Sequence, residues 1–186
     1  MSNFVINPSV FVKASNPVTW DFSVSGNGGY SQSAGTLTRT ASGVAWSTFA
    51  TGGTPVASST DQTLTFTDVT AGATDSQWYY GLSPLDGSGY PNGVTSADWD
   101  QNSVYYAWYT SGGGTNTSIY VNGSAVSNSM AVTSSSVLKL QIVSGVIKWY
   151  LDGVEKHSLT AVETSYTPVA LNKAGTGDTV HGDWST

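Results

Sequence analysis

The strongest constraint on the fold is a period-two alternation of apolar and polar residues that recurs along the whole chain. The stretch 18–24 reads VTWDFSV, and 138–142 reads LKLQI, so that every second side chain is apolar. This spacing is typical of a strand with one buried face, because successive side chains of a strand point to opposite sides. We expect further strands at 36–40, 44–50, 63–67, 77–83, 103–110, 118–122, 146–152, 154–159, 167–172 and 179–184.

Turn-forming stretches separate these runs, among them SGNGG, TGGTP, DGSG, SGGGTN, VNGS, VSGV and LDGV. Many short strands with one apolar face each predict two antiparallel sheets packed face to face. The fold class is therefore all-β, a two-sheet antiparallel β-sandwich of the jelly-roll kind, with one domain over 17–186. Residues 1–16 are apolar but contain Pro8, so we expect either an edge strand, where proline is tolerated, or an arm that docks onto another subunit.

The composition excludes several classes of function. Of the 186 residues only 10% are charged and the net charge is −6, so we expect no nucleic-acid partner. No stretch approaches the roughly 18 apolar residues that a spanning helix needs, so we expect no membrane insertion. The chain has no cysteine, which rules out disulfides, thiolate zinc sites and cysteine nucleophiles. Its start lacks the basic and apolar regions of a signal peptide. We expect synthesis in a host cytoplasm and a final place on a virion surface, or otherwise outside a cell.

The segment LKLQIVSGVIKWYLDGVEKHSL predicts three consecutive strands joined by the two-residue turns Ser144-Gly145 and Asp152-Gly153. It resembles a C-terminal element of concanavalin A-like lectin/glucanase domains, and especially the SPRY-like modules of bacterial and phage surface proteins. VTWDFSV, YYGLS, NSVYYAWYT and IYVNG fit the same family in order, so the resemblance covers roughly 18–184. It implies a curved two-sheet sandwich that is often glycan- or protein-binding and in some branches hydrolytic.

Catalysis by this chain is not expected. The hydrolytic branch carries acids that alternate along one strand, and a retaining glycosidase needs two carboxyls about 5–5.5 Å apart. Asp98 and Asp100 are the only such i, i+2 pair in the sequence. They lie in a loop-rich, solvated stretch that does not favour the raised pKa of a general acid. A glycoside hydrolase ranks third among the functions considered.

The same stretch, SADWDQN, also offers a D-x-D-x-N pattern of oxygen ligands. Asp98, Asp100 and Asn102 match the opening of a calcium loop, although no glutamate closes it. Ca²⁺ is accordingly the only cofactor considered. The alternative is a solvated turn whose aspartates cap backbone amides.

Several tyrosines fall on the outward side of strands whose inward side is set by apolar residues. If Trp78 and Tyr80 point inward, Tyr79 points outward, and the same alternation turns Tyr120 and Tyr150 outward. Exposed tyrosine offers a rigid apolar face and one hydroxyl, which suits sugar rings or a partner protein. The alternative is cross-strand pairing that only stabilises the sheet. The predicted ligand-binding residues are Tyr79, Tyr90, Asn92, Trp99, Tyr120 and Tyr150, of which Tyr90, Asn92 and Trp99 lie on the long loop 84–102.

The sequence thus predicts a non-enzymatic carbohydrate- or receptor-binding module on a virus or phage particle, such as a fibre, spike or decoration protein. Its expected partners are a glycan or a host surface receptor. Other virion proteins are expected to contact residues 1–16, and we expect a homo-oligomer. The alternative from another class is a purely structural capsid or decoration subunit whose outward tyrosines contact neighbouring proteins.

Overall fold

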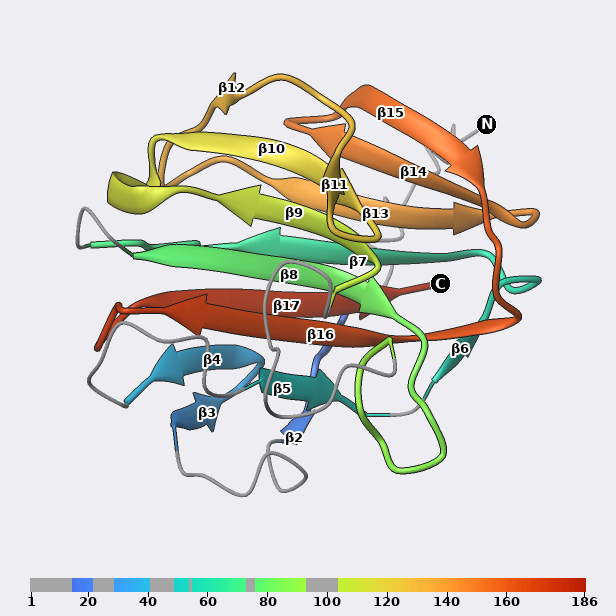
Figure 1. The fold of residues 1–186 in the computed structure, drawn as a ribbon, viewed down its shortest axis with the longest axis horizontal. Coiled ribbons are helices and arrows are strands. Elements are labelled where there is room, and N and C mark those ends of the chain that lie inside the picture. The colour runs from blue at the N-terminus through green and yellow to red at the C-terminus, as the bar shows by residue number, and fades with distance from the viewer. Residues whose placement is uncertain (1–14, 22–28, 41–48, 54, 73–75, 93–103) are drawn as a thin grey trace, which may run out of the picture.

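The alternation seen in the sequence becomes a two-layer β-sandwich in the computed structural model (Figure 1). The structure describes residues 15–21, 29–40, 49–53, 55–72, 76–92 and 104–186. Every strand pairing among them is antiparallel. The predicted fold class is confirmed.

One layer, here called sheet A, has the strand order β15-β14-β13-β7-β17-β4-β3, and β1 pairs with β17 beside β4. Its strands are β1 (Asn16–Pro17), β3 (Tyr30–Ser33), β4 (Thr36–Arg39), β7 (Gln62–Thr67), β13 (Leu138–Val143), β14 (Val146–Leu151), β15 (Val154–Thr160) and β17 (Thr179–Ser185).

The other layer, sheet B, has the order β11-β10-β9-β8-β16-β5-β2, with β12 paired to β10 and β6 to β16. Its strands are β2 (Trp20–Asp21), β5 (Phe49–Gly52), β6 (Val56–Ala57), β8 (Gln77–Ser83), β9 (Tyr106–Thr110), β10 (Asn116–Val121), β11 (Ser124–Ala125), β12 (Met130–Ala131) and β16 (Ser165–Lys173). In Figure 1 β16 passes in front of β17 near the middle of the two layers.

The main core lies between the sheets and is built from the inward side chains of both. Sheet A contributes Leu64, Phe66 and Leu140, and sheet B contributes Trp78 and Tyr80, all of them fully buried. Burial of such side chains away from water is the main force holding the two layers together.

The hairpins form where turn residues interrupt the alternation. Ser144 and Gly145 have φ values of 49° and 77°, and Asp152 and Gly153 have 50° and 80°. Two consecutive residues with positive φ match the primed turn expected from the sequence. The three strands predicted at the C-terminal side of the chain are β13, β14 and β15, paired in that order.

Some of the segments at the start of the chain lie outside the described residues. Residues 1–14 of the predicted arm are among them, as are 22–28 and 41–48 of the predicted early strands. Asn16 pairs with Trp184, and Pro17 pairs with Asp183. In the described part of the chain, no helix is long and apolar enough to cross a membrane.

Candidate functional site

The buried tryptophans all have hydrogen-bond partners for their indole N–H groups. Among the described residues, four tryptophans are fully buried, and each donates its indole N–H to a backbone carbonyl oxygen. Trp20, Trp78, Trp108 and Trp149 donate to Gly35, Thr70, Lys139 and Ala107 over 2.8, 2.8, 3.2 and 3.3 Å. A buried donor without a partner would cost about 1–3 kcal/mol, so the pairing is expected.

Trp184 differs from these four. It is only partly buried, and within the described residues its indole N–H has no hydrogen-bond partner. Its backbone is nevertheless fixed, because β17 pairs it with Leu64 of β7 on one side and with Asn16 of β1 on the other. The ring is therefore held in place while its polar edge stays available.

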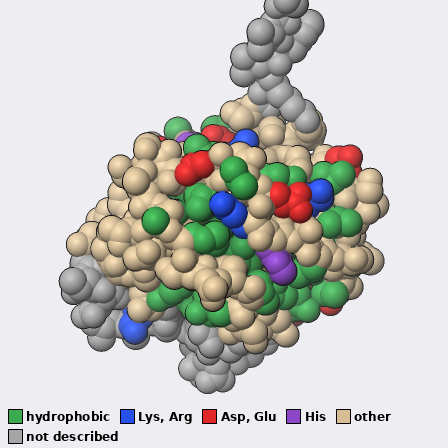
Figure 2. Space-filling view, turned by 90° about the horizontal axis from the view of Figure 1, so that it is seen from above, with side chains coloured by type: hydrophobic (Ala, Val, Ile, Leu, Met, Phe, Trp, Pro, Cys, Tyr) green, Lys and Arg blue, Asp and Glu red, His purple; other side chains and the backbone are tan. Residues whose placement is uncertain are grey.

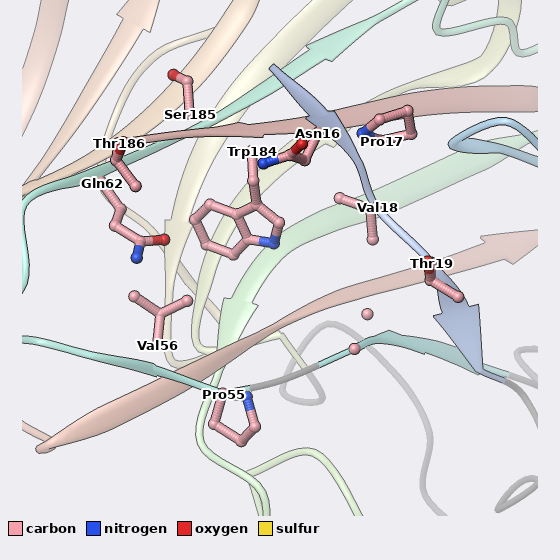
Figure 3. A pocket seen from close by; sticks show the side chains of 12 residues that line it. Asn16, Pro17, Val18, Thr19, Pro55, Val56, Gln62, Trp184, Ser185 and Thr186 are labelled. Atoms are coloured by element: carbon pink, nitrogen blue, oxygen red, sulfur yellow. The ribbon is translucent and has the colours of Figure 1, made fainter. Parts of the chain in front are cut away.

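A cavity of about 490 Å³ surrounds the Trp184 ring at one end of the sandwich. Figure 3 shows the indole extending into a space between Val18 on one side and Val56 and Gln62 on the other, with Pro55 below. The walls come from β1 and β17 of sheet A, from the start of β7, and from the β5–β6 segment of sheet B. The volume falls within the roughly 300–1,000 Å³ typical of small-molecule sites.

Several polar side chains around this cavity also lack hydrogen-bond partners. Among the described residues, the side chains of Asn16, Gln62, Thr19 and Ser185 form no hydrogen bond. An indole face beside free amides and hydroxyls combines an apolar stacking surface with donors and acceptors. We refer to this cavity as the Trp184 pocket.

The predicted tyrosine direction holds in β8, but the predicted exposure does not. Tyr80 belongs to the core between the sheets, whereas Tyr79 belongs to a second cluster on the outer face of sheet B. Tyr79 is only 4% exposed, because Tyr109 stacks on it at 4.6 Å between ring centroids and Tyr120 meets it edge-on at 5.3 Å. Period-two alternation gives the direction of a side chain but not what packs over it.

Tyr90 and Asn92 lie on the same outer face. Tyr90 packs against the second cluster, with its ring 6.2 Å from that of Phe49. The Asn92 amide donates to Asn122 Oδ1 over 2.9 Å, which ties the loop to the β10–β11 turn. The structure therefore brings four of the predicted ligand-binding residues, Tyr79, Tyr90, Asn92 and Tyr120, to one face of sheet B.

Tyr150 does not join them. It lies on β14 of sheet A, on the outer face, where its hydroxyl donates to Glu155 Oε2 over 3.1 Å. Glu155 also binds Lys148 Nζ at 3.2 Å, and these two hydrogen bonds, Lys148 first, lower the pKa of the Glu155 carboxyl. The predicted tyrosines therefore do not form one surface, because Tyr79 and Tyr120 lie on the outer face of sheet B and Tyr150 lies on the outer face of sheet A.

Trp99 and the three predicted calcium ligands, Asp98, Asp100 and Asn102, lie outside the described residues. Within the described ranges, no group of three histidine, aspartate or glutamate side chains is placed to hold a metal ion. Asp86, on the same connection, accepts the backbone N–H groups of Ser88 and Tyr90 and so caps its own turn.

The residues of the Trp184 pocket were not predicted from the sequence. They come from segments that are far apart along the chain, and nothing in their local pattern joins them. One signal was present, since Trp184 is the last inward-facing position of a predicted strand that ends at 184. A large aromatic ring at the end of a strand lies at the rim of the sandwich, where it is only partly covered.

Charged side chains are few on the face of the molecule that Figure 2 shows. Figure 2, which looks onto β12 and β15, shows a few charged side chains among mainly uncharged atoms, with apolar side chains gathered between them. Such a face favours ligand recognition by stacking and neutral hydrogen bonds over recognition by a strong electrostatic field.

Comparison with known proteins identifies the fold class and no closer relative. No family model matches the sequence, and no curated protein matches it. The structure is similar to the SPRY domain of human HERC1, with a TM-score of 0.60 and 16% identity over 91% of this chain and 96% of that domain. It is also similar to the carbohydrate binding module CBM66 from Bacillus subtilis, with a TM-score of 0.52 and 14% identity over 92% of this chain and 98% of that one.

A third similar structure is the carbohydrate recognition domain of Emp47p, with a TM-score of 0.54 and 12% identity over 92% of this chain and 94% of that domain. The chain therefore has the concanavalin A-like lectin/glucanase fold in its SPRY-like form. This fold includes carbohydrate-binding modules and lectin recognition domains. At these identities the likeness concerns the fold alone.

Proposed function

We propose that the protein is a non-enzymatic carbohydrate-binding module and that the Trp184 pocket is its binding site. The observation that carries the proposal is the contrast between Trp184 and the four tryptophans that donate their N–H groups within the protein. A sugar ring presents a C–H face that stacks on an indole and hydroxyls that accept its N–H.

The pocket offers binding groups but no arrangement for bond cleavage. Asn16, Gln62, Thr19 and Ser185 supply amides and hydroxyls, and the described residues that line the cavity include no aspartate, glutamate or histidine side chain. General acid–base catalysis needs a titratable group within hydrogen-bond reach of the reacting atoms. The pocket therefore supports binding without hydrolysis.

The place of the module is part of the proposal. A low-charge, hydroxyl-rich surface and the absence of cysteine suit a module displayed on a virus or phage particle. Many copies on one particle would allow weak individual affinities to suffice. The rival is a structural subunit whose outer face, including Tyr109 and Tyr120, contacts neighbouring proteins.

A glycan array followed by titration calorimetry tests the proposal. The wild type is expected to bind at least one glycan class saturably, and Trp184→Ala to bind it roughly thirty-fold more weakly, as for loss of an aromatic anchor. Tyr120→Ala, which alters the outer face of sheet B, is the matched control and is expected to bind like the wild type.

Two results would contradict the proposal. Saturable binding that Tyr120→Ala abolishes and Trp184→Ala preserves would place the site on the outer face of sheet B. The absence of saturable glycan binding by the wild type would favour the structural subunit.

A further inference from the structure

A second hollow lies on the outer face of sheet A, next to the Trp184 pocket. It measures about 450 Å³ and is lined by Thr63, Lys139, Gln141, Tyr150, Gly153 and Ser185. Ser185 also lines the Trp184 pocket, so the two hollows meet at the end of β17. The strand alternation explains this junction, since Trp184 faces inward and the next residue faces outward.

Lys139 is the cation of this hollow. In the strand register it lies directly between Tyr150 of β14 and Thr65 of β7. Among the described residues Lys139 forms no ion pair and no side-chain hydrogen bond. Its ammonium group therefore has three uncommitted donors beside the hydroxyls and amide of the hollow.

Two neighbouring carboxylates on this face contact side chains other than Lys139. Glu155, one strand beyond Tyr150, binds Lys148 at 3.2 Å. Asp183, one strand beyond Thr65, lies 3.0 Å from His181 Nε2. Among the described residues, neither carboxylate forms an ion pair with Lys139, so the Lys139 ammonium has no counter-charge in contact with it.

We infer that the ligand is an acidic oligosaccharide, with one sugar stacked on Trp184 and an adjoining carboxylated sugar bound at Lys139 across Ser185. The inference rests on the proposed function and specifies its ligand class. A hydrogen bond to a charged group is stronger than one between neutral groups, so Lys139 would select for the carboxylate. Gln141 and Thr63, joined by a hydrogen bond of 3.2 Å, form the neutral floor beside it.

The test compares carboxylated tetrasaccharides, built from hexuronic or sialic acids, with their carboxyl-reduced neutral forms by titration calorimetry. The wild type is expected to bind at least one carboxylated form roughly ten-fold more tightly than its reduced form. Lys139→Gln is expected to lose this preference while keeping its affinity for the reduced form, and Lys139→Arg to retain most of it. Lys156→Gln, on the exposed strand β15, is the matched control and should behave like the wild type.

The outcomes separate this inference from the proposed function. The inference of an acidic ligand is overturned if the wild type binds the carboxylated and the reduced forms equally. It is also overturned if Lys139→Gln keeps the preference for the carboxylated form. Neither result contradicts saccharide binding at Trp184. Failure of the wild type to bind either form of any tetrasaccharide, together with a glycan array that shows no binding, overturns both.

Discussion

At the scale of single residues, nearly all buried side-chain polar groups of the described residues have hydrogen-bond partners, with Ser83 Oγ as the exception. Asp178 is only 4% exposed, and its carboxylate accepts hydrogen bonds from the Gly72 backbone, the Ser76 hydroxyl and the Asn172 amide. Arg39 is also buried and donates to the Asn172 carbonyl oxygen over 2.9 Å. This network joins the end of β16 to two loops. The indole N–H of Trp184, at the rim of the sandwich, differs because it has no hydrogen-bond partner among the described residues.

The Asp178 carboxyl makes a pH-dependent contribution to stability. Burial raises its pKa above the ordinary value, although the Gly72 and Asn172 hydrogen bonds and the Arg39 charge oppose that shift. A folded-state pKa above the unfolded one, about 3.9, means that the native state holds the proton more tightly. The stabilisation of the folded protein by the Asp178 carboxyl is therefore fully present below about pH 4. It declines as the pH rises through the raised folded-state pKa.

Asp178→Asn removes the titrating carboxyl. The amide of the variant has one acceptor oxygen, whereas the Asp178 carboxylate accepts from three donors. We expect the free energy of unfolding to fall by about 1–3 kcal/mol at pH 7. Denaturant unfolding at pH 4 and pH 7 checks both effects, and the stability gap between wild type and variant should be wider at pH 4. A gap that widens toward pH 7 would show that burial does not dominate the pKa of Asp178.

At the scale of elements, the tight turns fix the register of the C-terminal hairpins. Gly145 has a φ of 77°, in the left-handed region, and Ser144 before it also has a positive φ. The turn joins β13 to β14, whose register pairs Val143 with Val146. The side-chain period of two makes this register decisive, because a slip of one residue would turn the apolar face outward.

Gly145→Ala tests the conformational demand of this turn. An added Cβ would meet no atom within 4 Å, so its effect comes from the positive φ alone. We expect a loss of about 1–2 kcal/mol in the free energy of unfolding. Gly87→Ala is the matched control, because its Cβ would also be in open space and its φ is not in the left-handed region. Equal stability of the two variants would contradict this account of the turn.

The elements were largely predictable from the sequence, because alternation and turn chemistry are local. The strands beginning at Gln77, Leu138 and Val146 follow the expected ranges closely. The strands β3, β6, β11 and β12 were missed, since β3 has only four residues and the others two, which are too few to show a period. The exposure of the predicted site residues was harder to predict. Tyr79 is buried by Tyr109 and Tyr120, and this contact depends on which strands become neighbours.

At the scale of the whole molecule, the sandwich is held by its core and by hydrogen bonds that cross between the sheets. Trp149 of sheet A donates to Ala107 of sheet B, and Trp108 of sheet B donates to Lys139 of sheet A. The Trp184 pocket arises at the end of the same two layers, where β1, β7 and β17 meet the β5–β6 segment. No local pattern predicts such a site, because it exists only after both sheets have formed.

Trp149→Ala would remove a fully buried ring and one of these cross-sheet hydrogen bonds. We expect a loss of about 3–5 kcal/mol in the free energy of unfolding, as is usual for a large aromatic side chain in a core. Urea unfolding measures it, with Trp184→Ala as the comparison. The Trp184 variant is expected to lose clearly less stability, because its ring is partly exposed. Comparable losses would mean that Trp184 serves the core rather than a ligand.

The central claim is that the Trp184 indole N–H is kept free for a saccharide. The most direct measurement is the indole region of a ¹H–¹⁵N NMR spectrum during titration with a glycan identified on the array, with the Trp184 signal assigned from Trp184→Phe. The account predicts that this signal shifts with saturation, while those of Trp20, Trp78, Trp108 and Trp149 stay in place. A Trp184 signal that does not move while the glycan binds would contradict it.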